Sequence, residues 1–319
     1  MQQLLSFLRK YHDGRSPLLL ALSGGSDSLA LWSMLIEAKK VYPFPLHIAH
    51  VDHGWREESA SQAADLEKLV GKPFHTIRLE NQVPSENGAR IGRFRYFLEL
   101  QEKWGFQAVL LAHHADDQAE TVLKRVLEGA HLAHLGGMVS RGVIKGVNCW
   151  RPLLKRTKKE LGCFLKNSPF WDSTNEDITF LRNRMRLEMV PFLEKSFGKN
   201  ICKNLALLGE RVHLLKDYLD YQTKKYEERV TKTSWGLLFD FTGLPIENAF
   251  EWEWLIKKRA ACLTDIQRIM DALTSGAPHH RISDYGVVDR YRFFWLEEKQ
   301  TSWQAEGSVH LQLKLLESK

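Results

Sequence analysis

The chain has 319 residues, 44% hydrophobic and 26% charged, with a formal net charge of +6 at pH 7. This length suggests two domains in a soluble globular protein, and the lack of a long apolar run argues against a transmembrane helix or a signal peptide. The four cysteines include no C-x-x-C pair, which favours a reducing, cytoplasmic location and argues against a zinc or iron–sulfur site.

Strands and helices are predicted to alternate over the first half of the chain. A short amphipathic helix at 1–10 comes first, and four apolar segments then have strand character, each followed by a helical pattern. The predicted strands are 18–22, 46–51, 74–79 and 108–112, and the predicted helices include 29–36, 57–70 and 88–104. This alternation predicts an α/β fold with a doubly wound, parallel, Rossmann-like sheet, which binds ligands at the carboxyl ends of its strands.

The second half is predicted to be less regular. Residues 129–146 are rich in glycine and histidine and are interpreted as a loop, and a helix capped by Thr157 follows. A basic helix is predicted from 180 to about 193, helical spacing recurs over 201–230, and short β-like segments lie beyond, at 235–239 and 292–296. Four tryptophans of this part are interpreted as core residues: Trp252, Trp254, Trp295 and Trp303. We therefore predict a catalytic domain at 1–196 and a smaller, helical or α+β accessory domain at 197–319.

A glycine-rich turn follows the first predicted strand. A turn that leads into a helix gathers free backbone N–H groups into an anion site, for which phosphate is the usual occupant. The glycines allow close approach because they lack Cβ, and the serines add hydroxyl donors. Unlike a P-loop, the turn contains no lysine, but its aspartate suits a Mg²⁺ ligand or an orienting group. A serine-capped helix start without a ligand is the alternative. The residues of this turn are Ser23, Gly24, Gly25, Ser26, Asp27 and Ser28.

Two further polar clusters also follow predicted strands and are expected to share the same site. His50 and Asp52, with Arg56 beyond them, could contact a base, bind a metal or assist proton transfer, or could form a simple polar loop. Asp117 and Glu120 lie on one face of a helix start. They are either helix caps or an acidic pocket for a cation, such as Mg²⁺ or an ammonium group.

Arginines form two groups on predicted helices. Arg90 and Arg93 share one helical face, and Arg182, Arg184 and Arg186 crowd another. Residues 141–200 hold 13 Lys/Arg against 6 Asp/Glu, a net charge of +7. Such groups near a nucleotide site favour phosphate binding and a nucleic-acid partner, although a solvated charged face is the ordinary alternative.

The turn is similar to the pyrophosphate loop of the N-type ATP pyrophosphatases, the PP-loop superfamily. Together with the other motifs, it makes the chain resemble the tRNA(Ile)-lysidine synthetases over about residues 15–195, in both order and spacing, whereas 200–319 match only in general character. The further motifs are HVDHGWR at 50–56, ARIGRF at 89–94, HHADDQAET at 113–121, RPLL at 151–154, DSTN at 172–175 and RNRMR at 182–186.

This resemblance implies a two-step reaction on the wobble cytidine, position 34, of a tRNA(Ile) with a CAU anticodon. The C2 oxygen attacks the α-phosphate of ATP and releases PPi, and free L-lysine then displaces AMP, which changes decoding from AUG to AUA and identity from Met to Ile. The implied cofactors are ATP and Mg²⁺. The implied roles are ATP binding by residues 23–28, His50 and Asp52; metal binding by Asp27; catalysis by Asp27, Arg90, Arg93 and Arg186; lysine binding by Asp117 and Glu120; and tRNA binding by Arg56, Arg151, Arg182, Arg184 and the accessory domain.

The chain departs from the family pattern in two places: His131 and His134 replace glycines, and Phe94 replaces a tyrosine. Three other functional classes compete with this interpretation. A tRNA cytidine thiolase would need paired cysteines, and an NAD or GMP synthetase would not need the basic segment. The third class is a tRNA-binding protein with a decayed ATP site. The motifs leave open which arginine serves which step, how the methionine CAU tRNA is rejected, and whether the protein is a homodimer.

Overall fold

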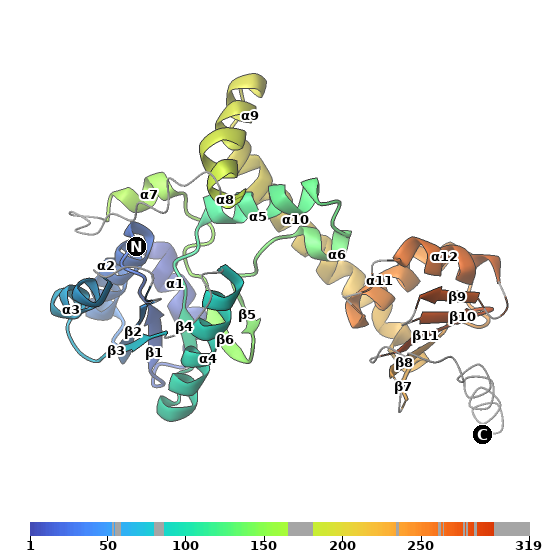
Figure 1. Ribbon diagram of the computed structural model, residues 1–319, viewed down its shortest axis with the longest axis horizontal. Coiled ribbons are helices and arrows are strands. Elements are labelled where there is room, and N and C mark those ends of the chain that lie inside the picture. Colours follow the sequence, from blue (N-terminus) through green and yellow to red (C-terminus); the bar gives the residue numbers. More distant parts are fainter. Residues whose placement is uncertain are drawn as a thin grey trace. The chain divides into compact units, whose positions relative to one another are not determined.

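The computed structural model shows two compact units, Met1–Glu210 and Arg211–Lys319 (Figure 1). The division falls within one helix, α10 (Ile201–Thr223). The functional boundary expected after residue 196 stays a prediction. None of the described helices is long and apolar enough to cross a membrane. The structure describes residues 1–52, 54, 59–79, 86–164, 181–233, 236–260, 263, 265–276, 278, 280–283 and 286–296.

The first unit is built on a six-stranded sheet in the order β3-β2-β1-β4-β6-β5. All adjacent pairs are parallel except β5 and β6, which are antiparallel. The four strands expected from the apolar runs are present, and the doubly wound α/β prediction is confirmed. The strands are β1 (Leu18–Ala21), β2 (Leu46–Asp52), β3 (Phe74–Arg78), β4 (Ala108–Leu110), β5 (Arg141–Ile144) and β6 (Val147–Trp150).

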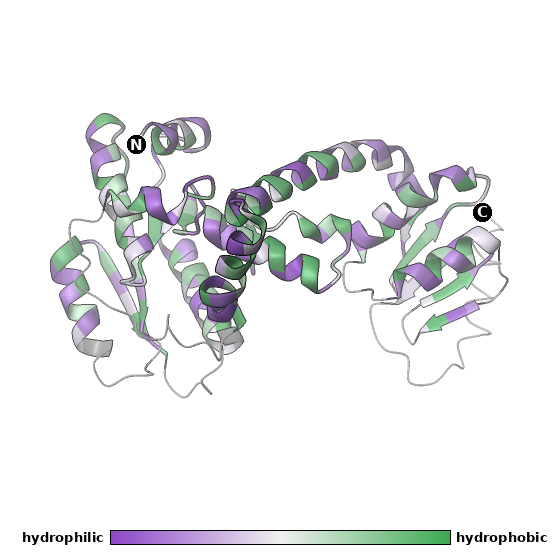
Figure 2. Cartoon of the chain, turned by 90° about the horizontal axis from the view of Figure 1, so that it is seen from above, coloured by the Kyte–Doolittle hydropathy of each residue, from purple (hydrophilic) through white to green (hydrophobic). Residues whose placement is uncertain are grey.

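Helices cover both faces of this sheet, so β1 is apolar throughout rather than alternating. Leu18 and Leu20 pack in one core with α1, α2 and α3, whereas Leu19 packs on the other face with aromatic residues of α4. Figure 2 shows hydrophobic and hydrophilic residues alternating along the helices of this unit, as expected where a helix packs on a sheet by one face. The helices are α1 (Gln2–Tyr11), α2 (Ser26–Val41), α3 (Ser59–Val70), α4 (Glu86–Trp104) and α5 (Ala115–Leu127).

The segment 129–146 is not the simple loop that its composition suggested. It contains α6 (Leu132–Leu135) and β5, which pairs with β6 through a tight turn. Lys145 and Gly146 have φ of 49° and 84°, the positive values that two-residue hairpin turns require. His131 has φ of −56° and accepts a hydrogen bond from the backbone N–H of Ala133, so it caps α6 and needs no glycine-like conformation.

The predicted basic helix is divided by one wide turn. It comprises α8 (Leu181–Arg184), a π-helical turn η2 (Met185–Met189) and α9 (Val190–Phe197), and it ends at Gly198. Pro191 is the second residue of α9, and a proline both lacks an N–H donor and clashes with the carbonyl four residues earlier. A π-helical turn directly before it accommodates the ring, and such turns are frequent at functional sites.

The second unit is α+β, as predicted. Its antiparallel sheet has the order β7-β8-β11-β10-β9. The helical pattern expected to reach residue 230 ends earlier, at Thr223, and a 3-10 turn follows. Trp252 and Trp254 are buried as expected, and Trp295 packs against the same core; Trp303 lies outside the described residues. The elements are η3 (Lys224–Arg229), β7 (Val230–Lys232), β8 (Gly236–Asp240), η4 (Ile246–Asn248), α11 (Ala249–Arg259), α12 (Ile266–Ser275), β9 (His280–Ser283), β10 (Gly286–Asp289) and β11 (Arg292–Leu296).

Candidate active site

The glycine-rich turn connects β1 directly to the N-terminus of α2. Gly24 has φ of +88°, a conformation that favours glycine, and a Cβ there would lie 3.2 Å from Cδ1 of Leu66. The serine hydroxyls bond within the turn: Ser23 Oγ donates to Ser28 Oγ at 3.2 Å, and Ser28 Oγ donates to the carbonyl of Gly25 at 2.8 Å. The turn therefore keeps a defined shape with its backbone amides at the start of a helix, as an anion site requires.

His50 and Asp52 support the strand ends beside this turn. Nδ1 of His50 donates to the carbonyl of Leu22 at 2.9 Å, and Oδ1 of Asp52 accepts from the backbone N–H of Gly54 at 2.8 Å. Both side chains are buried, and burial lowers the pKa of His50. Their predicted contact with ATP stays a prediction, and Arg56 lies outside the described residues.

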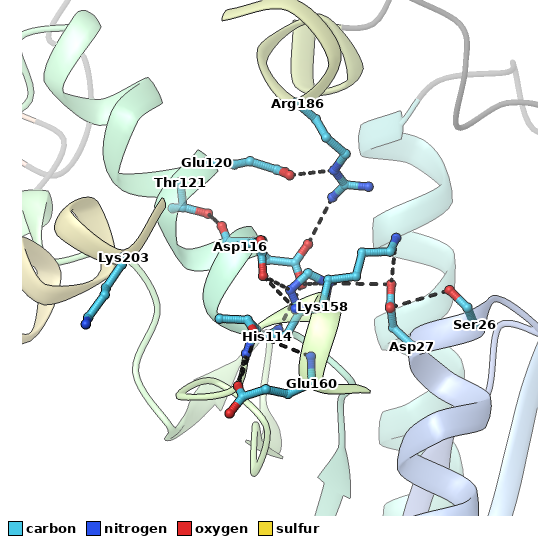
Figure 3. A network of polar contacts seen from close by, with 12 residues as sticks. Ser26, Asp27, His114, Asp116, Glu120, Thr121, Lys158, Glu160, Arg186 and Lys203 are labelled. Carbon is cyan, nitrogen blue, oxygen red and sulfur yellow. Dashed lines mark hydrogen bonds and ion pairs between the residues drawn. The ribbon is translucent and has the colours of Figure 1, made fainter. Parts of the chain in front are cut away.

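One buried histidine connects the turn to the acidic start of α5 (Figure 3). His114 is the N-cap residue of α5, and its Nε2 lies 3.5 Å from Oδ2 of Asp27 and 3.5 Å from Oδ2 of Asp117, while Nδ1 lies 3.4 Å from Asp116. Burial alone would lower the pKa of His114, but the carboxylates of Asp116, Asp27 and Asp117 raise it to about 9. The imidazole is therefore a cation at neutral pH and holds the carboxylates together.

The neighbouring histidine, His113, is uncharged at neutral pH. Burial lowers the pKa of His113 to about 4; the carboxylate of Asp117 opposes this shift, and Arg151, Arg182 and Arg90 add to it. Arg151, predicted to bind tRNA, is itself buried. It donates from Nε to Nδ1 of His113 at 3.2 Å and from Nη1 to a backbone carbonyl at 2.8 Å. Its geometry favours a role in holding the site.

These two histidines predict opposite slopes of stability with pH. The pKa of His114 is raised from 6.5 to about 9, so its stabilisation is complete below pH 6.5 and is lost as the pH rises through 9. The pKa of His113 is lowered to about 4, so its contribution is complete above pH 6.5 and is lost as the pH falls toward 4. Urea unfolding across this pH range measures both effects. The variant His114→Gln should remove only the loss of stability at alkaline pH, and His113→Gln should remove only the loss of stability at acid pH. Identical pH profiles for wild type and both variants would contradict these charge states.

Asp117 and Glu120 are both ion-paired with arginines of the α8–η2 segment. Arg182 donates to Asp117 at 2.7 Å and to Glu120 at 2.8 Å. Arg186 contacts the same two carboxylates at 3.3 and 2.6 Å. Asp117 and Glu120 are only 7% and 4% exposed as residues, so they form a buried acidic pair neutralised by two guanidinium groups. The predicted acidic pair is thus present, and both of its carboxylates are paired with the protein's own guanidinium groups.

The other predicted arginines of the described residues lie on α4 and α8. Arg184 is exposed on α8, and Arg93 is half-buried on α4. Arg90 is exposed and lies over the ring of Phe94, 5.4 Å from its centroid. The positive charge of Arg90 nevertheless lowers the pKa of His113 and of Arg151, which places Arg90 at the edge of the site.

Sequence reasoning missed two members of the site, His114 and Lys158. Lys158 begins α7 (Lys158–Gly162), and its Nζ lies 3.7 Å from Oδ2 of Asp27. Burial would raise the pKa of Asp27, but His114, Lys158 and Arg186 together hold it below its usual value. The position of His114 beside Asp116 was a visible signal, whereas nothing in the local pattern connects Lys158 to a turn so distant in the chain.

Comparison with known proteins identifies the family. The model of the PP-loop domain matches residues 1–193. The tRNA(Ile)-lysidine synthase of Protochlamydia amoebophila is 36% identical, covering 94% of this chain and 69% of that protein. That of Chlamydia muridarum is 40% identical, covering 77% and 79%. The chain belongs to the tRNA(Ile)-lysidine synthase family. As a member of this family, the protein is a ligase with an ATP-using PP-loop domain.

A solved structure supports the fold of this chain. The U34-tRNA thiolase NcsA from Methanococcus maripaludis, solved with its [4Fe-4S] cluster, superposes with a TM-score of 0.50 at 20% identity, covering 66% of this chain and 78% of that one. This likeness concerns the fold alone. Within the described residues, no group of three or more His, Cys, Asp or Glu is arranged to hold a metal ion.

Proposed function

We propose that the protein ligates free L-lysine to C2 of cytidine 34 in tRNA(Ile) with a CAU anticodon, through an adenylated cytidine. The observation that carries this proposal is the contact of His114 with both Asp27 of the turn and Asp117 of the acidic pair. This contact supports the proposal because it joins the turn proposed to bind phosphate to the carboxylates proposed to bind lysine. Two successive reactions on the same base need such a shared centre.

In the first step, the C2 oxygen of cytidine forms a bond to the α-phosphorus of ATP, and PPi leaves. The backbone amides of the 23–28 turn are suited to hold the leaving phosphates. Asp27 supplies a single carboxylate, which fits the usual Mg²⁺ arrangement of one or two carboxylates with substrate phosphates. The bound ion would supply neutralisation of phosphate charge. Arg90, Arg93 and Arg186 are proposed to stabilise charge on the α-phosphate and the base.

In the second step, the lysine ε-ammonium loses a proton to solvent, the free amine bonds to C2, and AMP leaves with the electrons of the C2–O bond. Asp117 and Glu120 are proposed to hold the ammonium group before attack, and Arg182 and Arg186 must then give up one or both carboxylates. The tRNA-binding roles of Arg56, Arg182, Arg184 and the C-terminal unit, the cytoplasmic location and a homodimer stay predictions. Burial of Arg151 favours an internal role over direct tRNA contact.

The test is to measure PPi release from ATP with purified protein and tRNA(Ile) bearing CAU, with and without L-lysine, using a methionine tRNA as control. We expect release only with the isoleucine tRNA, and AMP with a lysine-modified base only when lysine is added. Release without any tRNA would indicate a small-molecule ligase, and no release would leave a binding protein.

A further inference from the structure

A lysine from outside the glycine-rich turn reaches its aspartate. In Figure 3 the side chain of Lys158 extends from the start of α7 toward Asp27, and the two groups are 3.7 Å apart. The side chain of Lys158 is half exposed, so it does not lie within the core. Its contact with Asp27 places the ammonium group beside the turn that is proposed to bind phosphate.

The position of Lys158 is determined by its backbone and not by the ion pair. Its N–H donates to Oδ2 of Asp116 at 2.8 Å, and the carbonyl of Arg156 accepts from the N–H of Ala115 at 2.7 Å. A capping box between Thr157 and Glu160 fixes the first turn of α7. The start of α7 is thus held against the start of α5, and the lysine side chain remains free to change partner.

An ion pair this exposed contributes little to folding, so stabilisation gives no sufficient reason for the arrangement. A different reason lies in the turn itself. P-loops carry a lysine that contacts the β- and γ-phosphates, and the turn at 23–28 has none. We propose that Lys158 supplies this missing ammonium group and binds the phosphates of ATP at the turn. The proposal rests on ATP binding at this turn, and Asp27 is the partner of Lys158 when the nucleotide is absent.

The experiment compares Lys158→Met with Lys159→Met, which removes the same charge from the next position of α7. Calorimetric titration with ATP, inorganic pyrophosphate and adenosine measures binding without tRNA or lysine, so the result does not depend on the ligase activity. We expect Lys158→Met to weaken ATP and pyrophosphate binding about 10-fold or more, as loss of a charge-assisted contact does, and to leave adenosine binding unchanged.

The control variant Lys159→Met should bind all three probes as the wild type does, and Lys158→Arg should restore most of the ATP affinity. Equal ATP affinity of Lys158→Met and wild type would overturn the proposal. So would a parallel loss of adenosine binding, since that would indicate a general disturbance of the site. Failure of the tRNA reaction with normal ATP binding would instead count against the proposed function.

Discussion

Replacing Asp117 by asparagine should reduce lysine transfer by about 10- to 100-fold, because a charge-assisted hydrogen bond to a buried carboxylate contributes about 1.5–3 kcal/mol. Asparagine can still accept the hydrogen bond from the backbone N–H of His114, made at 2.9 Å. Its amide, however, would present N–H groups to Arg182 or to the incoming ammonium. PPi release with tRNA(Ile) should be largely retained, and both steps can be followed with radiolabelled ATP and lysine.

The matched control is Glu128→Gln at the other end of α5. Glu128 forms an exposed pair with Lys124 at 3.7 Å, so neither step should change. If PPi release from Asp117→Asn fell as far as lysine transfer, then Asp117 would serve the first step as well, and its assignment to lysine would be wrong.

The variant Gly24→Ala is expected to lose PPi release by about 100-fold, the effect that a displacement of about 1 Å has on well-aligned reacting groups. Its φ of +88° is unfavourable for alanine, and the new Cβ would press on Leu66 at 3.2 Å. The turn would relax, and the amides that face the phosphates would move with it. ATP turnover and ATP binding measure this loss.

A second glycine with positive φ provides the control, because its replacement causes the same backbone strain outside the 23–28 turn. Gly71 has φ of +75° and nothing within 4 Å of the position of a Cβ, so Gly71→Ala should cost about 1–2 kcal/mol of stability without loss of turnover. Should both variants keep full activity, or lose it equally, the turn at 23–28 would not be the ATP site.

The sheet could be predicted because its central strands are buried on both faces. Such strands appear as short apolar runs that end in polar clusters, and β1 to β4 are of this kind. The β5–β6 hairpin was hidden by the glycine and histidine content of the segment before it, although Lys145 and Gly146 were a usable turn signal. The end of α10 at Thr223 was missed because apolar spacing continues into the 3-10 turn that follows.

The individual residues of the site could be predicted from the sequence, but the ion pairs between them could not. Local pattern placed Asp117 and Glu120 on one helical face, and the structure agrees. Their pairing with Arg182 and Arg186 depends on how the α8–η2 segment packs against α5, which no local spacing reveals. The contact of Lys158 with Asp27 is hidden for the same reason, since it is made by tertiary packing.

Under the proposed function, lysine binding to the acidic pair is a competition with the two guanidinium groups already on it. An amino acid arriving at the resting protein must displace internal cations that already satisfy both carboxylates. Any partner that draws Arg182 or Arg186 away, as RNA phosphates would, raises the affinity for lysine. By thermodynamic linkage lysine then raises the affinity for that partner by the same factor. The pocket would thus remain closed to cellular lysine, and to related diamines, until the RNA substrate is present.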